Sequence, residues 1–347
     1  MAHANLSERE RRVLEAVIQT YVESAEPAGS RTISRRFSIG VSPATIRNTM
    51  SDLEEKGYLF HPHTSAGRVP TDMAYRVYVD SLMRLPQLDA EAHGRLMEHL
   101  AGGGTAIEAI LRRAAQVLGV LTQELGVVLG PRLEEARLQR LELIRISSEK
   151  LLMVLALEGG AARSIFVEVP GEIAEAVLAE VARVLNERLA GLTLREIRTS
   201  FSDRLRDSGT ARETSELLNI FLHGADQIFD VANPLSESPV LLGQTSVLAE
   251  QPEFASGENL RKLLALTEHP EQLGEFLRQR TVPAGIAITI GAEHEDPTLS
   301  EFTVVTAAYQ AGALSGVIGV IGPTRMPYEK VITLVTHTSR LITDLLQ

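Results

Sequence analysis

The residue pair Ser42-Pro43 constrains the N-terminal part of this chain more than any other feature of the sequence. Serine is a favoured N-cap and proline is favoured at the first helical position, so we predict that a helix begins here. Ile46, Met50 and Leu53 recur at helical spacing and predict its buried face. Gly57 supplies the left-handed conformation that often ends a helix.

The segments on either side place this helix in a larger pattern. Ser7 and Glu10 form a capping box that predicts a helix as far as Ser24, and Ser30 can cap a short second helix through Phe37. A short strand is predicted at Tyr58–Phe60, followed by a polar, turn-rich loop at His61–Pro70. Two helices, a turn, a third helix, a strand and a loop predict a winged helix-turn-helix.

The third helix is predicted to enter the major groove of DNA, where such a helix reads base edges with its first turns. Its outward-facing residues are then Ala44, Thr45, Arg47, Asn48 and Ser51. Arg47 can bridge two acceptors of guanine and Asn48 can bridge adenine. Ser42 leaves backbone N–H groups directed at phosphate.

Further contacts to the DNA backbone are predicted on both sides of this helix. Three arginines of the preceding helix can touch phosphate: Arg31, Arg35 and Arg36. Three residues of the loop can reach phosphate or the minor groove: His63, Thr64 and Arg68.

The charge distribution agrees with this location. The net charge is −11, yet residues 1–80 hold ten Lys/Arg and ten Asp/Glu and are neutral. Within residues 29–70 there are six basic residues and three acids, and these acids lie close together near one helix end. The acidic remainder repels phosphate, which confines DNA to one surface.

Catalytic and metal-binding patterns are weak or missing. The chain has no cysteine, nucleophile elbow, HExxH motif or complete P-loop, so we expect no enzyme activity and no cofactor. His61 and His63 share a face of an extended segment, but they lack the nearby carboxylate or thiolate of a good metal site, so no metal is expected. Gly316, Gly319 and Gly322 are interpreted as positions of close packing rather than nucleotide binding.

The rest of the chain is predicted to mix helices with strands. Residues 87–126 are predicted to form two helices around a triple glycine. Residues 192–280 have a less regular pattern. It predicts helices at Leu217–Phe229 and Leu260–Arg278, and either a strand or a helix start at Pro239–Leu248. Strands are predicted at Leu141–Ile146, Leu151–Leu157, Ser164–Val169, Gly285–Ile290, Phe302–Tyr309 and Gly316–Ile321, and helices at 172–190 and Tyr328–Leu346. Strands that flank a more helical stretch indicate one α+β domain with another inserted into it.

Four segments resemble the HrcA family, the bacterial heat-inducible transcription repressors. They are Leu6–Arg9, Ser42–Glu54, His63–Thr71 and Gly319–Met326. The resemblance implies a multidomain α+β fold with an N-terminal winged helix-turn-helix and a GAF-like domain that carries an inserted dimerisation domain. The expected boundaries are 1–86 for the DNA-binding domain, 87–190 and 281–347 for the GAF-like domain, and 191–280 for the insertion.

The same resemblance implies a homodimer that binds the inverted-repeat operator CIRCE upstream of chaperone operons and is released on heat shock. It also implies the GroEL chaperonin as a partner that keeps the repressor active. Two alternatives stay open: a repressor that responds to a metabolite bound in the GAF-like domain, and a winged helix that binds protein.

The sequence predicts a cytoplasmic protein with no membrane partner. There is no apolar run of about 18 residues and no signal peptide, and the absence of cysteine fits a reducing compartment.

Overall fold

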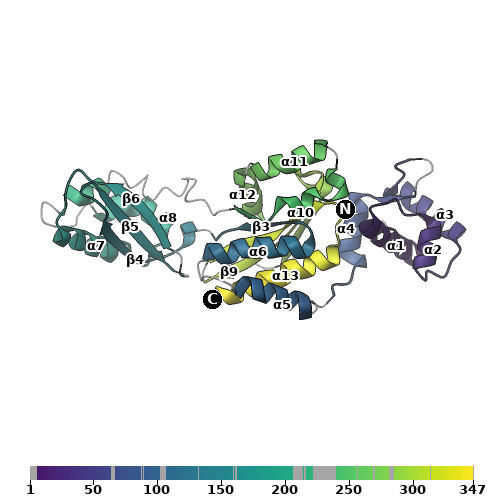
Figure 1. The fold of residues 1–347 in the computed structure, drawn as a ribbon, viewed down its shortest axis with the longest axis horizontal. Coiled ribbons are helices and arrows are strands. Elements are labelled where there is room, and N and C mark those ends of the chain that lie inside the picture. The colour runs from purple at the N-terminus through teal and green to yellow at the C-terminus, as the bar shows by residue number, and fades with distance from the viewer. Residues whose placement is uncertain are drawn as a thin grey trace.

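The computed structural model describes most of the chain and shows three units in a row along its longest axis (Figure 1). The described residues are 6–63, 67–86, 88, 90–101, 107–131, 133–158, 160, 162–205, 214, 216–221, 240–255, 257–268, 270–280, 285–312 and 314–346. None of the helices formed by these residues is long and apolar enough to cross a membrane.

The N-terminal unit consists of three helices and a two-stranded antiparallel hairpin, followed by a linking helix. Its elements are α1 (Glu8–Ser24), α2 (Ser30–Arg36), α3 (Pro43–Glu55), β1 (Leu59–Phe60), β2 (Val69–Pro70) and α4 (Asp72–Val77), which continues as a π-helical turn at Tyr78–Leu82. Val13, Leu14, Ile33, Ile46 and Leu53 are fully buried between the helices. Met73 of α4 is 43% exposed.

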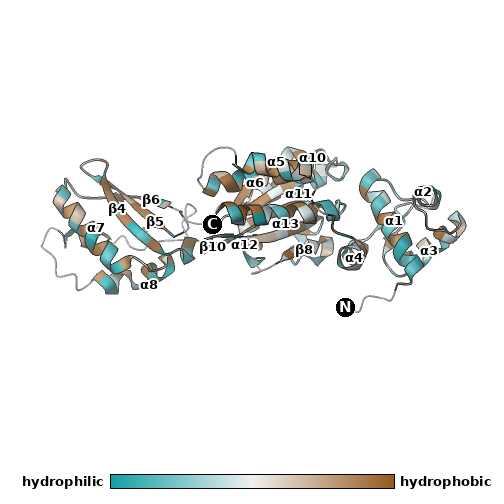
Figure 2. Ribbon diagram, turned by 90° about the horizontal axis from the view of Figure 1, so that it is seen from below, coloured by the Kyte–Doolittle hydropathy of each residue, from teal (hydrophilic) through white to brown (hydrophobic). Residues whose placement is uncertain are grey.

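A five-stranded antiparallel sheet forms the central unit, with strand order β7-β3-β10-β9-β8. Its strands are β3 (Leu125–Leu129), β7 (Val240–Leu242), β8 (Ile286–Ile290), β9 (Phe302–Ala311) and β10 (Leu314–Pro323). The strand at β3 was missed, because the sequence analysis continued the preceding helix through residue 126. Figure 2 shows that hydrophobic residues are concentrated in the strands of this sheet.

Helices cover both faces of the central sheet (Figure 1). One face carries α6 (Ile107–Thr122) and α13 (Tyr328–Leu345), with α5 (Ala90–Ala101) packed beside them. The other carries α10 (Thr245–Ala249), α11 (Gly257–Glu268) and α12 (Pro270–Gln279), with short 3-10 turns at Pro252–Phe254, Gly291–Glu293 and Pro297–Leu299.

The inserted unit lies at the far end of the molecule from the N-terminal unit (Figure 1). It begins with a 3-10 turn at Leu133–Glu135 and contains an antiparallel sheet of β4 (Leu138–Arg145), β5 (Lys150–Leu157) and β6 (Ala162–Glu168). Two helices, α7 (Glu175–Leu189) and α8 (Leu194–Leu205), and a helical segment at 216–221 cover one face of this sheet.

Among the described residues, the insertion therefore includes those between 133 and 205 and those between 214 and 221, whereas it was expected at 191–280. Strands β4 to β6 form a hydrophobic core of their own with α7 and α8, whereas they were expected to belong to the central unit. Residues 240–280, expected in the insertion, instead supply β7 and the helices that pack on the central sheet. The strand pattern alone does not say which sheet a strand joins, and this is why the expected boundaries differ from those observed.

Three predictions concern residues 217–278, and the structure refines two of them. The helix expected at Leu260–Arg278 is two helices, because Pro270 lacks the N–H that a continuous helix needs and instead begins α12. Both alternatives for Pro239–Leu248 occur, since β7 is followed at once by α10. Of the helix expected at Leu217–Phe229, residues 222–229 lie outside the described residues.

Candidate DNA interface

The helix start predicted at Ser42-Pro43 is confirmed. The Ser42 side chain accepts a hydrogen bond from the Thr45 backbone N–H at 3.1 Å, and Pro43 occupies the first turn. Ile46 and Leu53 are fully buried and Met50 is 3% exposed, so the expected inner face packs on the core. The outer face is thereby fixed in orientation.

Most of the residues predicted to contact DNA lie at the surface. The exposed ones are Arg31, Arg35, Arg36, Ser42, Ala44, Arg47, Asn48 and His63, and the partly buried ones are Thr45, Ser51 and Arg68. Thr64 lies outside the described residues. The Thr45 hydroxyl is 3.0 Å from that of Ser42, which holds both side chains at the start of α3.

The N-cap of α2 lies one residue earlier in the sequence than expected. Gly29 is the N-cap and makes no side-chain hydrogen bond, while Ser30 is the first helical residue and is buried. Arg36 at the end of α2 forms an ion pair with Glu23 of α1, and its guanidinium lies 5.3 Å from the centre of the Phe37 ring. Arg36 therefore also ties α2 to α1.

A surface hollow of about 450 Å³ lies where α2, α3 and the hairpin meet. Its lining residues are Ala28, Gly29, Ser30, Arg31, Arg47, Met50, Gly67 and Arg68. The hollow thus gathers arginines from α2, α3 and the hairpin around one concave, polar surface. Such a surface suits a phosphate group, because guanidinium groups bind phosphate through paired N–H donors.

The hairpin is fixed to α3 through Glu54, whose role the sequence analysis missed. One carboxylate oxygen of Glu54 lies 2.9 Å from Nδ1 of His61, and the other lies 2.7 Å from the Arg68 guanidinium. Only 12% of the Arg68 side chain is exposed, and its Nε is buried without a hydrogen-bond partner. Arg68 therefore braces the hairpin, in addition to the contact with phosphate or the minor groove that was predicted for it.

The same end of the hairpin is bonded to the loop before α2. The backbone of Arg68 exchanges two hydrogen bonds with Ala28, at 2.8 and 3.0 Å. A Cβ at Gly67 would lie 2.4 Å from the Ala28 carbonyl oxygen, so only glycine fits this approach. The described residues contain no group of three potential metal ligands, at His61 and His63 or elsewhere.

A further ion pair, between Glu10 and Lys56, joins α1 to the end of α3. Glu10 accepts from Lys56 Nζ at 2.6 Å and from the Ser7 backbone N–H at 2.8 Å, which completes the predicted capping box. The hydrogen bond from Lys56 lowers the pKa of Glu10 to about 2, and the bonds from Ser7 act in the same direction. The start of α1 is thus anchored to the end of α3.

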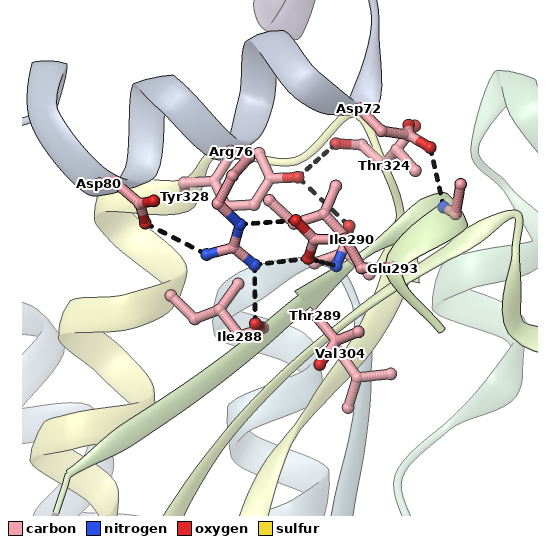
Figure 3. A network of polar contacts seen from close by, with 12 residues as sticks. Asp72, Arg76, Asp80, Ile288, Thr289, Ile290, Glu293, Val304, Thr324 and Tyr328 are labelled. Carbon is pink, nitrogen blue, oxygen red and sulfur yellow. Dashed lines mark hydrogen bonds and ion pairs between the residues drawn. The ribbon is translucent and has the colours of Figure 1, made fainter. Parts of the chain in front are cut away.

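Polar contacts also connect α4 to the edge strand of the central sheet (Figure 3). Arg76 donates to Glu293 from Nε at 2.7 Å and to the Ile288 carbonyl at 2.8 Å, and Asp72 accepts from the Ala292 backbone N–H at 2.9 Å. The rings of Tyr75 and Tyr328 pack at 5.6 Å between centroids. These contacts set the position of α4 on the central unit.

Arg325 makes a further bridge between the two units. It lies in the late segment Gly319–Met326 and donates to the Val22 carbonyl at the end of α1 at 2.7 Å. It also donates to Glu253 of the central unit at 2.9 Å. The hydrogen bond and ion pair with Glu253 raise the pKa of Arg325, so the guanidinium stays charged.

The fold and this surface define a three-unit α+β protein whose N-terminal helical unit presents exposed arginines on α2 and α3. The family described as "HrcA protein C terminal domain" matches residues 108–332. The chain is 42% identical to the heat-inducible transcription repressor HrcA of Chlorobium phaeobacteroides (strain BS1), with 97% of each chain covered. It is 36% identical to the protein of that name from Geobacter sulfurreducens, with 99% of each covered.

A solved structure titled "Crystal structure of a hypothetical protein at 2.2 A resolution" has the same fold, with a TM-score of 0.63, 21% identity and 99% of each chain covered. The chain belongs to the HrcA family, as the resemblance in the four sequence segments indicated. Its relatives are named as heat-inducible transcription repressors, a regulatory role that is not enzymatic.

Proposed function

We propose that the chain is a DNA-binding repressor of heat-shock chaperone operons and that its N-terminal unit is a winged helix-turn-helix. The observation that supports this proposal most directly is the outer face of α3, where Arg47 and Asn48 are exposed beside an arginine-lined hollow. Arginine and asparagine pair with guanine and adenine edges in the major groove. The hairpin then acts as the wing, and the central unit is the GAF-like domain.

The operator in this proposal is the CIRCE inverted repeat, which requires two copies of α3 related by a two-fold axis. An apolar surface on the inserted unit supports the homodimer. Ile144 of β4, Leu152 of β5 and Phe166 of β6 are direct neighbours across the strands, on the face opposite α7 and α8. Ile144 is 44% exposed and Phe166 is 69% exposed, and exposed apolar clusters of this kind mark interfaces.

The proposal retains the GroEL chaperonin as a partner that keeps the repressor active, with release from DNA on heat shock. Both the chaperonin partner and the release on heat shock rest on the family resemblance. A footprint on a chaperone promoter with and without chaperonin tests it: protection that does not depend on the chaperonin would remove this partner from the proposal.

Replacement of Arg47 tests the reading role of α3. Arg47→Ala is expected to weaken operator binding by about 1–3 kcal/mol and to relax preference at one position in each half-site. Competition binding with operators substituted at single positions measures both effects, and Glu55→Ala on the exposed end of α3 serves as control. If binding weakens equally on all sequences, Arg47 contacts phosphate; if it does not change, α3 is not the reading helix.

Replacement of Phe166 tests the dimer surface. Phe166→Glu places a charge at the β6 end of the row formed by Ile144, Leu152 and Phe166. We expect sedimentation equilibrium to show monomers, and we expect these monomers to lose binding to the inverted repeat. Leu264→Glu is the matched control, because Leu264 is also an exposed apolar residue. Its side chain is 43% exposed on α11 of the central unit. A Phe166→Glu protein that stays dimeric would exclude this surface.

A further inference from the structure

Arg325 holds the N-terminal unit to the central unit with all three nitrogens of its guanidinium. One terminal nitrogen donates to the Val22 carbonyl at the end of α1, at 2.7 Å. The other terminal nitrogen and Nε donate to the two carboxylate oxygens of Glu253, the former at 2.9 Å. Only 13% of the Arg325 side chain and 24% of the Glu253 side chain are exposed. Paired hydrogen bonds of this kind fix direction as well as distance.

The central-unit side of this contact is rigidly supported. Glu253 is followed by Phe254, which is 4% exposed and stacks on the Phe302 ring of β9 with 5.9 Å between ring centres. Arg325 is followed by Met326, which is fully buried. Both partners of the ion pair are therefore anchored by a neighbouring residue in the core of the central unit. The end of α1 is thus bonded to a fixed point.

The N-terminal unit has a second attachment through α4. There Arg76 bonds to Glu293 and to a carbonyl of the edge strand β8 (Figure 3). Helices α1 and α4 pack on each other within the N-terminal unit, yet they are attached to different elements of the central unit. A body held at one place can rotate about it, and a second attachment removes that rotation. Arg325 therefore fixes an angle that the α4 contact leaves open.

This angle has its largest effect at α3. Helix α3 lies on the outer side of the N-terminal unit, farther from the central unit than α1 (Figures 1 and 2). A rotation at the joint therefore displaces α3 more than it displaces the end of α1. In a two-fold symmetric dimer both copies of α3 move, so the separation between them changes. Dimers of this kind recognise half-sites at a defined separation along the DNA.

We propose that Arg325 is a positioning residue that sets the separation of the two reading helices and thereby the half-site spacing that the dimer accepts. This inference rests on the proposed function, in which a homodimer reads an inverted repeat with α3. Arg325 acts here through α1 and not by contact with DNA. Its loss leaves the contacts of one α3 with one half-site intact and reduces the additional affinity gained by binding two half-sites at once.

The first test measures affinity for three kinds of DNA: the natural inverted repeat, repeats with the spacer shortened or lengthened by single base pairs, and a single half-site. Arg325→Gln is expected to bind the natural repeat about tenfold more weakly than the wild type, to bind the single half-site equally well, and to discriminate less between spacers. Arg325→Lys should lie between the two, because lysine keeps the charge but lacks the paired donors. Arg112→Gln is the matched control, since it breaks an exposed ion pair with Glu108 within α6.

The second test measures the joint without DNA. The chain has no cysteine, so Glu55→Cys on α3 and Glu258→Cys on α11 introduce a unique pair of thiols at two exposed positions. Spin labels on these thiols report the distance between the two units, in labelled chains diluted with unlabelled ones. We expect Arg325→Gln to broaden or shift the distance distribution, and Arg112→Gln to leave it unchanged.

The outcomes separate this inference from the proposed function. A wild type that binds no inverted repeat overturns the proposed function and the inference with it. A wild type that binds the repeat, with an Arg325→Gln protein that keeps its spacer preference or its distance distribution, overturns the inference alone, as does an equal loss on the repeat and on the single half-site. If Arg325→Gln fails to fold, Glu253→Ala takes its place under the same criteria, because it removes the ion pair and leaves the bond to Val22.

Discussion

Replacing Glu54 tests whether the hairpin is held in place by one carboxylate. Glu54→Ala removes the partner of both His61 and Arg68 and leaves the Arg68 guanidinium, 12% exposed, without a counter-charge. Exposed ion pairs contribute about 0–1 kcal/mol, whereas breaking a buried pair costs about 3–5 kcal/mol. Because Glu54 is 32% exposed, solvent screening reduces the loss, and we expect about 1–2 kcal/mol.

This cost is local, so amide hydrogen exchange in the full chain is the suitable measurement. The N–H groups of Ala28 and Arg68 bond to each other's carbonyls, and they open when the hairpin leaves α3. A loss of 1–2 kcal/mol corresponds to exchange that is faster by a factor of roughly 5–30.

Glu55→Ala is the matched control, since this acid is the next residue on α3 and is exposed. Exchange at Ala28 and Arg68 should stay at the wild-type rate in that variant. The reasoning is refuted if Glu54→Ala leaves these rates unchanged, or if both variants accelerate them equally.

Two further predictions concern stability. Because the pKa of Glu10 is lowered in the folded state, to about 2, its stabilising effect is present above the unfolded value near 4.5 and is lost as the pH falls from there through about 2. Scanning calorimetry from pH 6 downward should show a smaller decrease in Tm for Glu10→Gln than for the wild type, and identical slopes would contradict the assigned pairing with Lys56. Gly322→Ala places a Cβ 2.0 Å from a carboxylate oxygen of the buried Glu124 and should destabilise the chain by about 1–3 kcal/mol, whereas Gly171→Ala, with no atom within 4 Å of its Cβ, should be tolerated. Equal Tm values for these two variants would exclude the predicted clash.

The N-terminal unit was predictable because its determinants are local. An N-cap, a proline and a glycine that adopts φ +80° at position 57 lie within sixteen residues of one another and fix α3 without reference to the rest of the chain. The interpretation of Gly316, Gly319 and Gly322 also holds, since a Cβ at Gly319 would lie 2.1 Å from the Val305 carbonyl oxygen.

What could not be predicted depends on residues distant in the sequence. Strands β4 and β9 join different sheets, and their partners, β5 in one case and β8 with β10 in the other, are not specified by the local pattern from which each strand was predicted. Likewise, Arg68 lies in a polar loop and was interpreted only as a residue that can contact DNA. The bracing of Arg68 by Glu54 and Ala28 arises from tertiary contacts that no local pattern encodes.

The position of β3 has a consequence for how the chain is made. This strand is buried along its whole length, but both of its neighbours, β7 and β10, come after the insertion. During synthesis from the N-terminus, Leu125–Leu129 therefore emerges long before anything can pair with it. This apolar strand therefore stays unpaired while the inserted unit, which follows it in the sequence, is synthesised and folds. An unpaired apolar strand favours aggregation. The amount of finished protein should follow the cell's capacity to protect nascent chains.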